Sequence, residues 1–149
     1  MYTDIQPALP DPAVQPEFYD GVAVKRGIAW AIDVVVVALM VVPAVVLTAF
    51  IGLFFLPFLY AAISFVYRVL SISGGSATWG MRLMAIELRD TAGRRLDFGQ
   101  AFLHTVGYTV SLAFAPLQVI SVILMLATER GQGLTDHVMG TAALNRRAI

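Results

Sequence analysis

The chain has 149 residues, of which 58% are hydrophobic and only 13% are charged, and its formal net charge is zero. Because a soluble globular domain carries roughly 25% charged residues, this composition argues against a water-soluble fold and favours a protein that has a bilayer as its solvent. The sequence contains no cysteine, which excludes disulfides and thiolate chemistry.

Residues 1–20 are an acidic, proline-rich tail. They hold four acidic residues, no basic residue and four of the seven prolines, whereas all ten basic residues lie from Lys25 onward. The tail lacks the basic start of a signal peptide, and its composition cannot form a core. We expect an extended, solvated tail. The alternative is that it lies across a partner, or across basic surface of the chain's own membrane domain, residues 21–149.

The first apolar stretch, residues 27–67, is long enough for two membrane-spanning helices of ~20 residues each. Only a few polar side chains interrupt it. We predict a tight helical hairpin, with helices at about residues 22–48 and 51–70 and a turn near residues 48–52.

Prolines and basic residues define the bends and the orientation of this hairpin. Pro43 and Pro57 are expected to bend the two helices near the turn. Lys25 and Arg26 mark the entry of the first helix, and Arg68 marks the exit of the second. The positive-inside rule therefore places the open end of the hairpin, and with it the N-terminus, in the cytoplasm.

A polar segment follows the hairpin. The glycine- and serine-rich stretch 71–82 is expected to be a loop in which Thr78 caps a short turn that contains Trp79. Residues 84–89 then alternate between apolar and polar side chains, which predicts a half-buried strand. The turn sequence DTAG and the short run RRL complete a predicted cytoplasmic β-hairpin at about residues 83–96.

The second apolar stretch is divided by Pro116 into helices expected at about residues 98–114 and 116–128. Asp97 with Gln100 fits a capping box that opens the first of them. The stretch is too short for two full spans, yet one crossing would place the C-terminal arginines outside. We therefore expect a hinge and a returning C-terminus, with a single crossing as the alternative.

The C-terminal segment is predicted to form a very short helix and a strand. Thr135 and Asp136 are typical of a helix start and Gly140 of its end, and residues 141–145 could pair with the strand at 84–89. These elements together predict an all-α membrane protein. It consists of a transmembrane helical hairpin, a broken third and fourth helix, and a small cytoplasmic β-hairpin.

Three charged residues stand in an order that a known family shares. Arg26 lies at the head of the first membrane helix, Asp33 follows seven residues later in the same helix, and Asp136 lies near the C-terminus. In this arrangement the chain resembles the RDD family of small bacterial membrane proteins, which is named for one arginine and two aspartates. The resemblance covers roughly residues 19–146.

The link between the hairpin and the later helix also resembles that family. In the sequence TWGMRLMAIELRDTAGRRLDFGQAF, Thr78, Gly80 and Arg82 stand in matching places. One departure is Thr135, which stands where the family usually has histidine, with His137 after the aspartate. The resemblance implies a multi-pass protein of the bacterial inner membrane. Ligand transport has been proposed for the family, and some members have been linked to cation/proton antiport.

A carboxylate within the apolar run costs several kcal/mol unless something neutralises it. Arg26 and Asp33 share a helical face but lie about 10 Å apart along the axis, so we predict that Asp136 pairs with Arg26 at the cytoplasmic end. Asp33 then needs other donors, or burial that keeps it protonated. The candidate donors come from its own helix, the second helix and the later helix: Trp30, Tyr60, Ser64, Tyr67, Arg68, His104 and Tyr108.

Two function classes stay open. In the first, Arg26, Asp33 and Asp136 are architectural, and the chain is a non-enzymatic accessory or assembly subunit of a larger membrane complex, or a homo-oligomer. In the second, the chain is a small cation/proton transporter that uses Asp33 as its ion or proton site. We expect no catalytic set, no metal site and no cofactor, because the sequence has none of the corresponding motifs. The expected partners are the bilayer, with Arg94 and Arg95 near anionic headgroups, and other membrane subunits, but not nucleic acid.

Overall fold

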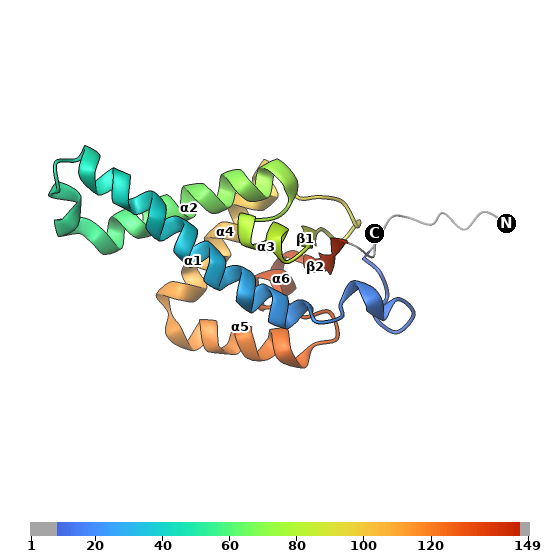
Figure 1. Ribbon diagram of the computed structural model, residues 1–149. Coiled ribbons are helices and arrows are strands. Elements are labelled where there is room, and N and C mark those ends of the chain that lie inside the picture. The colour runs from blue at the N-terminus through green and yellow to red at the C-terminus, as the bar shows by residue number, and fades with distance from the viewer. Residues whose placement is uncertain (1–8, 147–149) are drawn as a thin grey trace.

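The structure, a computed structural model, describes residues 9–146 and is mostly helical. A long helical hairpin extends from a body that contains the shorter helices and a two-stranded sheet (Figure 1). The elements in chain order are η1 (Pro16–Phe18), α1 (Val22–Leu47), η2 (Ile51–Phe55), α2 (Leu56–Gly75), α3 (Trp79–Leu83), β1 (Ile86–Arg89), α4 (Phe98–Ala113), α5 (Ala115–Ala127), α6 (Leu134–Met139) and β2 (Ala142–Asn145).

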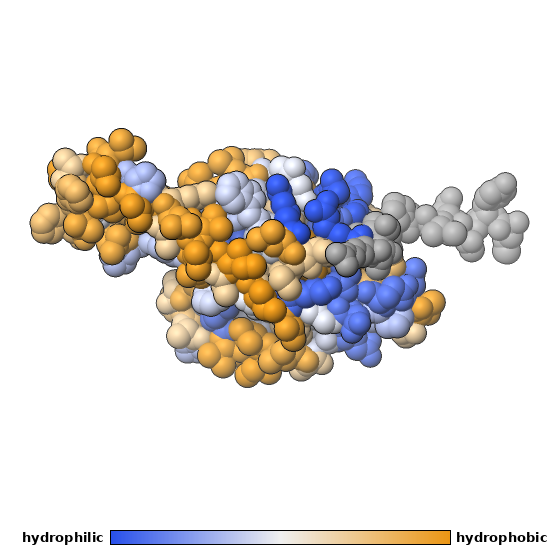
Figure 2. All heavy atoms as spheres, in the orientation of Figure 1, coloured by the Kyte–Doolittle hydropathy of each residue, from blue (hydrophilic) through white to orange (hydrophobic). Residues whose placement is uncertain are grey.

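Among residues 9–146, two segments are long and apolar enough to cross a membrane. They are Pro16–Leu47, which contains α1, and Ile51–Gly75, which contains α2, with mean hydropathies of 2.6 and 1.9. The bent pair of α4 and α5 makes a third if it is counted as one span. The hairpin tip projects beyond the other helices (Figure 1), and apolar residues cover it, whereas hydrophilic residues gather at the opposite end (Figure 2).

The second half of the hairpin differs from expectation in two places. Pro57 stands in the first turn of α2, where a missing N–H is tolerated, so it starts this helix rather than bending it. α2 also continues to Gly75 and ends at Ser76, whose φ of 60° is left-handed. The first part of the expected loop is therefore helical. Thr78 caps α3 as predicted, by accepting a hydrogen bond from Met81 N.

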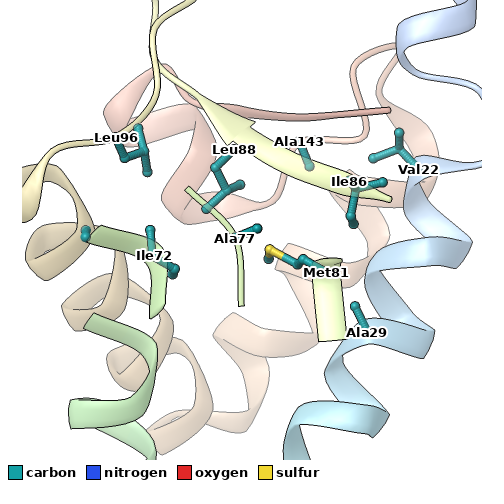
Figure 3. Packing of buried hydrophobic residues seen from close by; sticks show 10 residues of the cluster. Val22, Ala29, Ile72, Ala77, Met81, Ile86, Leu88, Leu96 and Ala143 are labelled. Atoms are coloured by element: carbon teal, nitrogen blue, oxygen red, sulfur yellow. The ribbon is translucent and has the colours of Figure 1, made fainter. Parts of the chain in front are cut away.

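A two-stranded antiparallel sheet lies at the polar end of the molecule. β1 pairs with β2, with Leu88 opposite Ala143, which confirms the predicted pairing of residues 141–145 with the first strand. The side chains of Ile86 and Leu88 point toward α3 and the end of α2, where they join the main hydrophobic core (Figure 3). The sheet therefore packs the C-terminal strand onto the hairpin.

The β-hairpin predicted at residues 83–96 is reduced to a single bridge between Arg89 and Arg95. The chain leaves the sheet directly afterwards, because Leu96 N donates instead to Ser76 Oγ at 2.9 Å. The position beside β1 is thus taken by the C-terminal strand rather than by the returning arm of a hairpin.

The polar face of β1 is buried, so the expectation of a half-buried strand is wrong. Glu87 is only 1% exposed, because three arginines surround its carboxylate. Arg89 pairs with Oε1, while side-chain nitrogens of Arg95 and Arg146 lie 3.4 and 3.5 Å from Oε2. Alternation along this strand therefore separates an apolar interior face from an ion-paired one.

The described part of the N-terminal tail packs on β2. Tyr19 is buried against Leu144, and the side-chain amide of Asn145 donates to two backbone carbonyls just before α1, at 2.9 and 2.8 Å. Apolar packing and this amide thus hold the end of the described tail on the domain, whereas most of residues 11–17 are exposed. Residues 1–8 lie outside the described part of the chain.

The later helices fold back toward the polar end. A capping box of Asp97 and Gln100 opens α4, as predicted, and the axes of α4 and α5 differ by 117° across a break at Phe114. Beyond α5 the chain reaches the start of α1 again, where Lys25 Nζ donates to Asn145 Oδ1 at 2.6 Å. The C-terminal strand and the start of α1 therefore lie at one end of the molecule.

Candidate functional site

Two buried carboxylates organise the polar interior. Asp33 of α1 is 5% exposed, and Asp136 of α6 is 1% exposed. A buried charge without partners costs several kcal/mol, so each of these acids depends on the donors around it. The two acids have separate sets of donors, which come from different elements.

Asp33 binds α2 and the start of α3. Its Oδ1 accepts hydrogen bonds from Tyr67 Oη at 2.7 Å and from Gly80 N at 2.9 Å. Its Oδ2 accepts one from Thr78 Oγ1 at 2.6 Å. Arg68 Nη1 lies 4.0 Å from Oδ2, which is an ion-pair contact but too long for a hydrogen bond. Three donors and a nearby guanidinium thus surround this carboxylate.

The same cluster caps α3. The first three N–H groups of this helix, those of residues 79–81, donate in turn to Tyr67 Oη, Asp33 Oδ1 and Thr78 Oγ1. A helix leaves these N–H groups without partners of its own. The position at which α3 begins is therefore set by the residues that accept them.

Gly80 permits the close approach of α3 to α1. A Cβ at this position would lie 2.2 Å from Ala29 O and 2.9 Å from Asp33 Oδ1. Only glycine fits between the two helices without moving one of them, and this fit brings the Gly80 N–H within reach of the carboxylate.

Two of the donors predicted for Asp33 lie beside it, namely Tyr67 in direct contact and Arg68 at ion-pair distance. Two others form a separate stack. Trp30 Nε1 donates to Tyr108 Oη at 2.8 Å, and the Tyr108 ring centroid lies 3.8 Å from the guanidinium carbon of Arg68. Tyr108 therefore contacts Asp33 only through the arginine.

Of the remaining predicted donors, Tyr60 and His104 bind other groups, and Ser64 lines a cavity. Tyr60 Oη donates to Val34 O at 3.2 Å, and Ser64 lies in the wall of a cavity of about 330 Å³. His104 binds Asp136 rather than Asp33, with 2.9 Å between its Nε2 and Oδ1. His104 of α4 is therefore a partner of Asp136 and not of Asp33.

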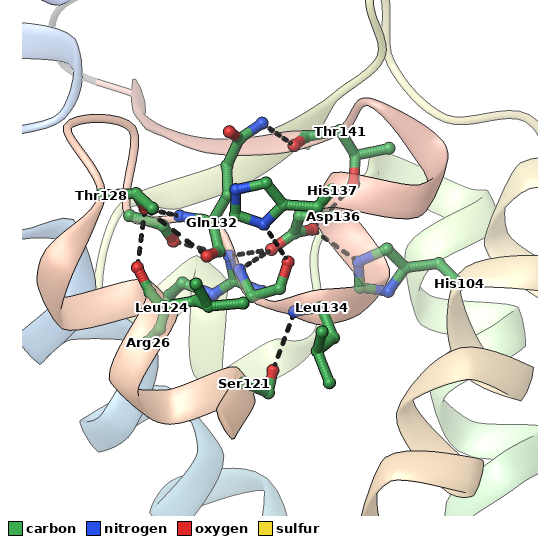
Figure 4. Close-up of polar contacts among 12 residues, drawn as sticks. Arg26, His104, Ser121, Leu124, Thr128, Gln132, Leu134, Asp136, His137 and Thr141 are labelled. Carbon is green, nitrogen blue, oxygen red and sulfur yellow. Dashed lines mark hydrogen bonds and ion pairs between the residues drawn. The ribbon is translucent and has the colours of Figure 1, made fainter. Parts of the chain in front are cut away.

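Asp136 joins α6 to α1, α4 and the start of β2 (Figure 4). Its Oδ2 pairs with Arg26 Nη1 at 2.5 Å and accepts from Gly133 N at 3.0 Å. Its Oδ1 accepts from Thr141 Oγ1 at 2.7 Å and from His104 Nε2. The predicted pairing of Arg26 with Asp136 is therefore present in the structure.

The electrostatics of this cluster favour the ionised carboxylate. Burial by itself raises the pKa of Asp136, but the charge of Arg26 and the hydrogen bonds from His104 and Thr141 lower it further than burial raises it. The pKa of Asp136 consequently lies well below its ordinary value. At neutral pH the residue is an anion that holds three helices together.

A cavity of about 440 Å³ lies between the two clusters. The acidic and basic side chains in its wall are Arg26, Asp33, Arg68, His104 and Asp136, and α5 supplies much of its apolar wall. Within residues 9–146, no three His, Asp or Glu side chains are placed to hold one metal ion.

Four donors to these carboxylates were not predicted from the sequence: Thr78 and Gly80 for Asp33, and Gly133 and Thr141 for Asp136. The sequence could have indicated Thr78 as a donor, because a threonine that caps a helix through its oxygen still has a proton to donate. The backbone N–H groups of Gly80 and Gly133 could not have been identified as donors from the sequence, because every residue except proline has a backbone N–H group.

A comparison with protein-family models gives a match over most of the chain. The model of the RDD family matches residues 21–140, a range that contains Arg26, Asp33 and Asp136. Neither the curated proteins nor the solved structures give a significant match. Because the family model covers most of the chain, this protein belongs to the RDD family.

Proposed function

We propose that this protein is a non-enzymatic integral membrane protein that serves as an accessory or assembly subunit of a larger membrane complex, or as a homo-oligomer. The observation that carries the proposal is that donors from the chain itself surround both buried carboxylates. Asp33 and Asp136 thereby join α1 to α2, α3, α4 and α6. This supports an architectural role for both acids over exchange of ions with solvent.

An exposed apolar surface on the hairpin supports association within the bilayer. The outer parts of α1 and α2 and the turn between them project beyond the rest of the molecule (Figure 1). Such a surface packs against lipid or against another transmembrane helix, so the experiment has to separate these two. Its most exposed large side chains are Leu39, Leu47, Phe54, Phe55 and Phe58.

The mass of the protein extracted in a mild detergent tests this proposal. After expression at native level, we expect native mass spectrometry to find a multiple of the 16.1 kDa chain or a stoichiometric complex with another membrane protein. Phe54→Ser at the hairpin tip should lower recovery of that assembly. Val138→Ser is the matched control, because Val138 is 86% exposed at the polar end and Phe54 is 85% exposed. A chain that is monomeric and alone contradicts the proposal.

A cation/proton transporter is the second candidate, and one observation favours it. Asp33 lines both the cavity of about 440 Å³ and the cavity of about 330 Å³, so its carboxylate borders space that a small ion could enter. Flux measured in everted vesicles should then collapse in Asp33→Asn and persist in Asp20→Asn, because Asp20 is exposed before α1. Absence of flux in the unmodified protein, or equal flux in Asp33→Asn, removes this candidate.

A further inference from the structure

Arg68 is a buried cation whose hydrogen-bonding capacity the protein does not use fully. Its side chain is 7% exposed, and its Nε has no hydrogen-bond partner among residues 9–146. A carboxylate oxygen of Asp33 stays at 4.0 Å, and the ring of Tyr108 stacks on the guanidinium carbon at 3.8 Å. A guanidinium presents five donors, and leaving buried donors without acceptors is costly.

The other charged groups around the cavity of about 440 Å³ already have partners. Arg26 and Asp136 pair with each other at 2.5 Å, and Asp136 also accepts from His104, Thr141 and a backbone N–H. Asp33 holds three donors. Of the two arginines in the wall of this cavity, Arg26 is held by Asp136 and by Gly131 O, whereas the buried Nε of Arg68 has no acceptor among residues 9–146.

The mouth of the cavity lies among apolar side chains. Trp30, Leu112, Val122 and Leu126 line it and are 42–69% exposed. They belong to α1, α4 and α5, which are among the candidate membrane-spanning segments. A molecule that enters the cavity past these apolar side chains comes from an apolar phase. An acceptor that reaches Arg68 by this route would therefore carry an apolar chain.

We propose that this cavity binds the anionic headgroup of a membrane amphiphile on the Arg68 guanidinium, with the apolar chain of the amphiphile between α1 and α5. A guanidinium matches two oxygens of one phosphate or carboxylate group, and a low local dielectric strengthens such a contact. The volume of about 440 Å³ accommodates a headgroup and the start of its chain. The inference goes beyond the assembly role, because it assigns a ligand class to the domain.

Fluorescence of Trp30 provides the test. Its indole donates to Tyr108, which stacks on Arg68, so a bound anion changes its surroundings. The full chain is prepared in dodecyl maltoside with Trp79→Phe, which leaves Trp30 as the sole tryptophan. Titration with dodecyl phosphate should give a saturable change, and Arg68→Gln should weaken the apparent affinity about tenfold or more.

Matched variants and a second ligand decide the outcome. Arg94→Gln is the control for charge, because Arg94 is 73% exposed outside the cavity, and it should bind as the unmodified chain does. Inorganic phosphate should give no response at the concentrations at which dodecyl phosphate saturates. An equal response to inorganic phosphate overturns the amphiphile assignment, and a response that is unsaturable or unchanged in Arg68→Gln overturns the site.

A variant at the mouth keeps the proposal testable if Arg68→Gln does not fold. Val122→Phe narrows the entrance without touching the guanidinium and should weaken binding several-fold. Ile123→Phe places the same side chain at a neighbouring residue that is 57% exposed and outside the cavity wall, and it should bind normally. Equal affinities of these two variants for dodecyl phosphate contradict the proposal.

Discussion

At the level of single residues, the two buried carboxylates differ in the kind of donor that surrounds them. Asp33 takes two hydroxyl groups and one backbone N–H, with Arg68 at ion-pair distance. Asp136 is paired directly with Arg26 and also binds His104. The second acid therefore has the stronger charge partner, and removing its charge should have the larger effect on stability.

Asp136→Asn should destabilise the protein by about 3–5 kcal/mol, because it leaves the buried guanidinium of Arg26 without its counter-charge. The side chains of this pair are 9% and 1% exposed. Thermal unfolding in a mild detergent, followed by circular dichroism, measures the effect. Asp20→Asn removes an exposed acid before α1 and should leave the unfolding temperature nearly unchanged. Equal stability of the two variants would show that the pair contributes little.

Acid should weaken the same cluster. The folded state lowers the pKa of Asp136 below the value of about 3.9 in an unfolded chain. The stability that it contributes is therefore present above that unfolded value and is lost as pH falls toward the folded value. We expect the unfolding temperature to drop between about pH 5 and pH 3 more steeply in the unmodified chain than in Asp136→Asn. Parallel pH profiles of the two proteins would contradict this assignment.

At the level of elements, the short helix α3 is the part whose position depends most on its neighbours. It has only five residues, too few to be stable alone, and its first N–H groups are satisfied by Tyr67, Asp33 and Thr78. Its contact with α1 also needs the space left by Gly80. The orientation of α3 therefore depends on all the residues of the Asp33 cluster.

Gly80→Ala should destabilise the protein by about 1–3 kcal/mol, because the added methyl group overpacks the contact between α3 and α1. Its Cβ would lie 2.2 Å from Ala29 O. Gly74→Ala is the matched control, since a Cβ there meets nothing within 4 Å and alanine favours the helix. Thermal unfolding of both variants in the same detergent distinguishes them. A Gly80→Ala protein as stable as Gly74→Ala would refute the packing argument.

The elements show how far the sequence alone could lead. The hairpin followed from the apolar length of residues 27–67, and the Asp97 capping box from local residue types. The burial of Glu87 could not be predicted, because it depends on arginines distant in the chain, such as Arg146. In the same way, nothing local identifies Gly80 N as a donor to Asp33, since this contact exists only once two helices approach.

At the level of the whole molecule, the polar groups gather at one end and the apolar hairpin tip lies at the other (Figure 2). The start of α1, the sheet and the segment after α5 all lie at the polar end (Figure 1). If the hairpin spans a bilayer, this arrangement puts both ends of the domain on the same side and the turn of the hairpin on the opposite side.

Labelling of single cysteines tests this topology, and the natural absence of cysteine makes the experiment direct. Asp20→Cys, before α1, and Glu129→Cys, after α5, should react with an impermeant thiol reagent from the cytoplasmic side. Ala49→Cys in the hairpin turn should react from the opposite side only. All three positions are exposed. Labelling of residues 20 and 129 from opposite sides would establish a single crossing by α4 and α5.

The separate partner sets of the two acids impose an order on biosynthesis. Asp33 finds its donors within residues 67–80, whereas the Asp136 cluster includes Thr141. Since chains fold from the N-terminus as they are made, the first cluster can close while the ribosome is still producing α4. Arg26 must wait for its counter-ion until the C-terminal segment emerges. An unfinished copy therefore carries an arginine that has no counter-charge.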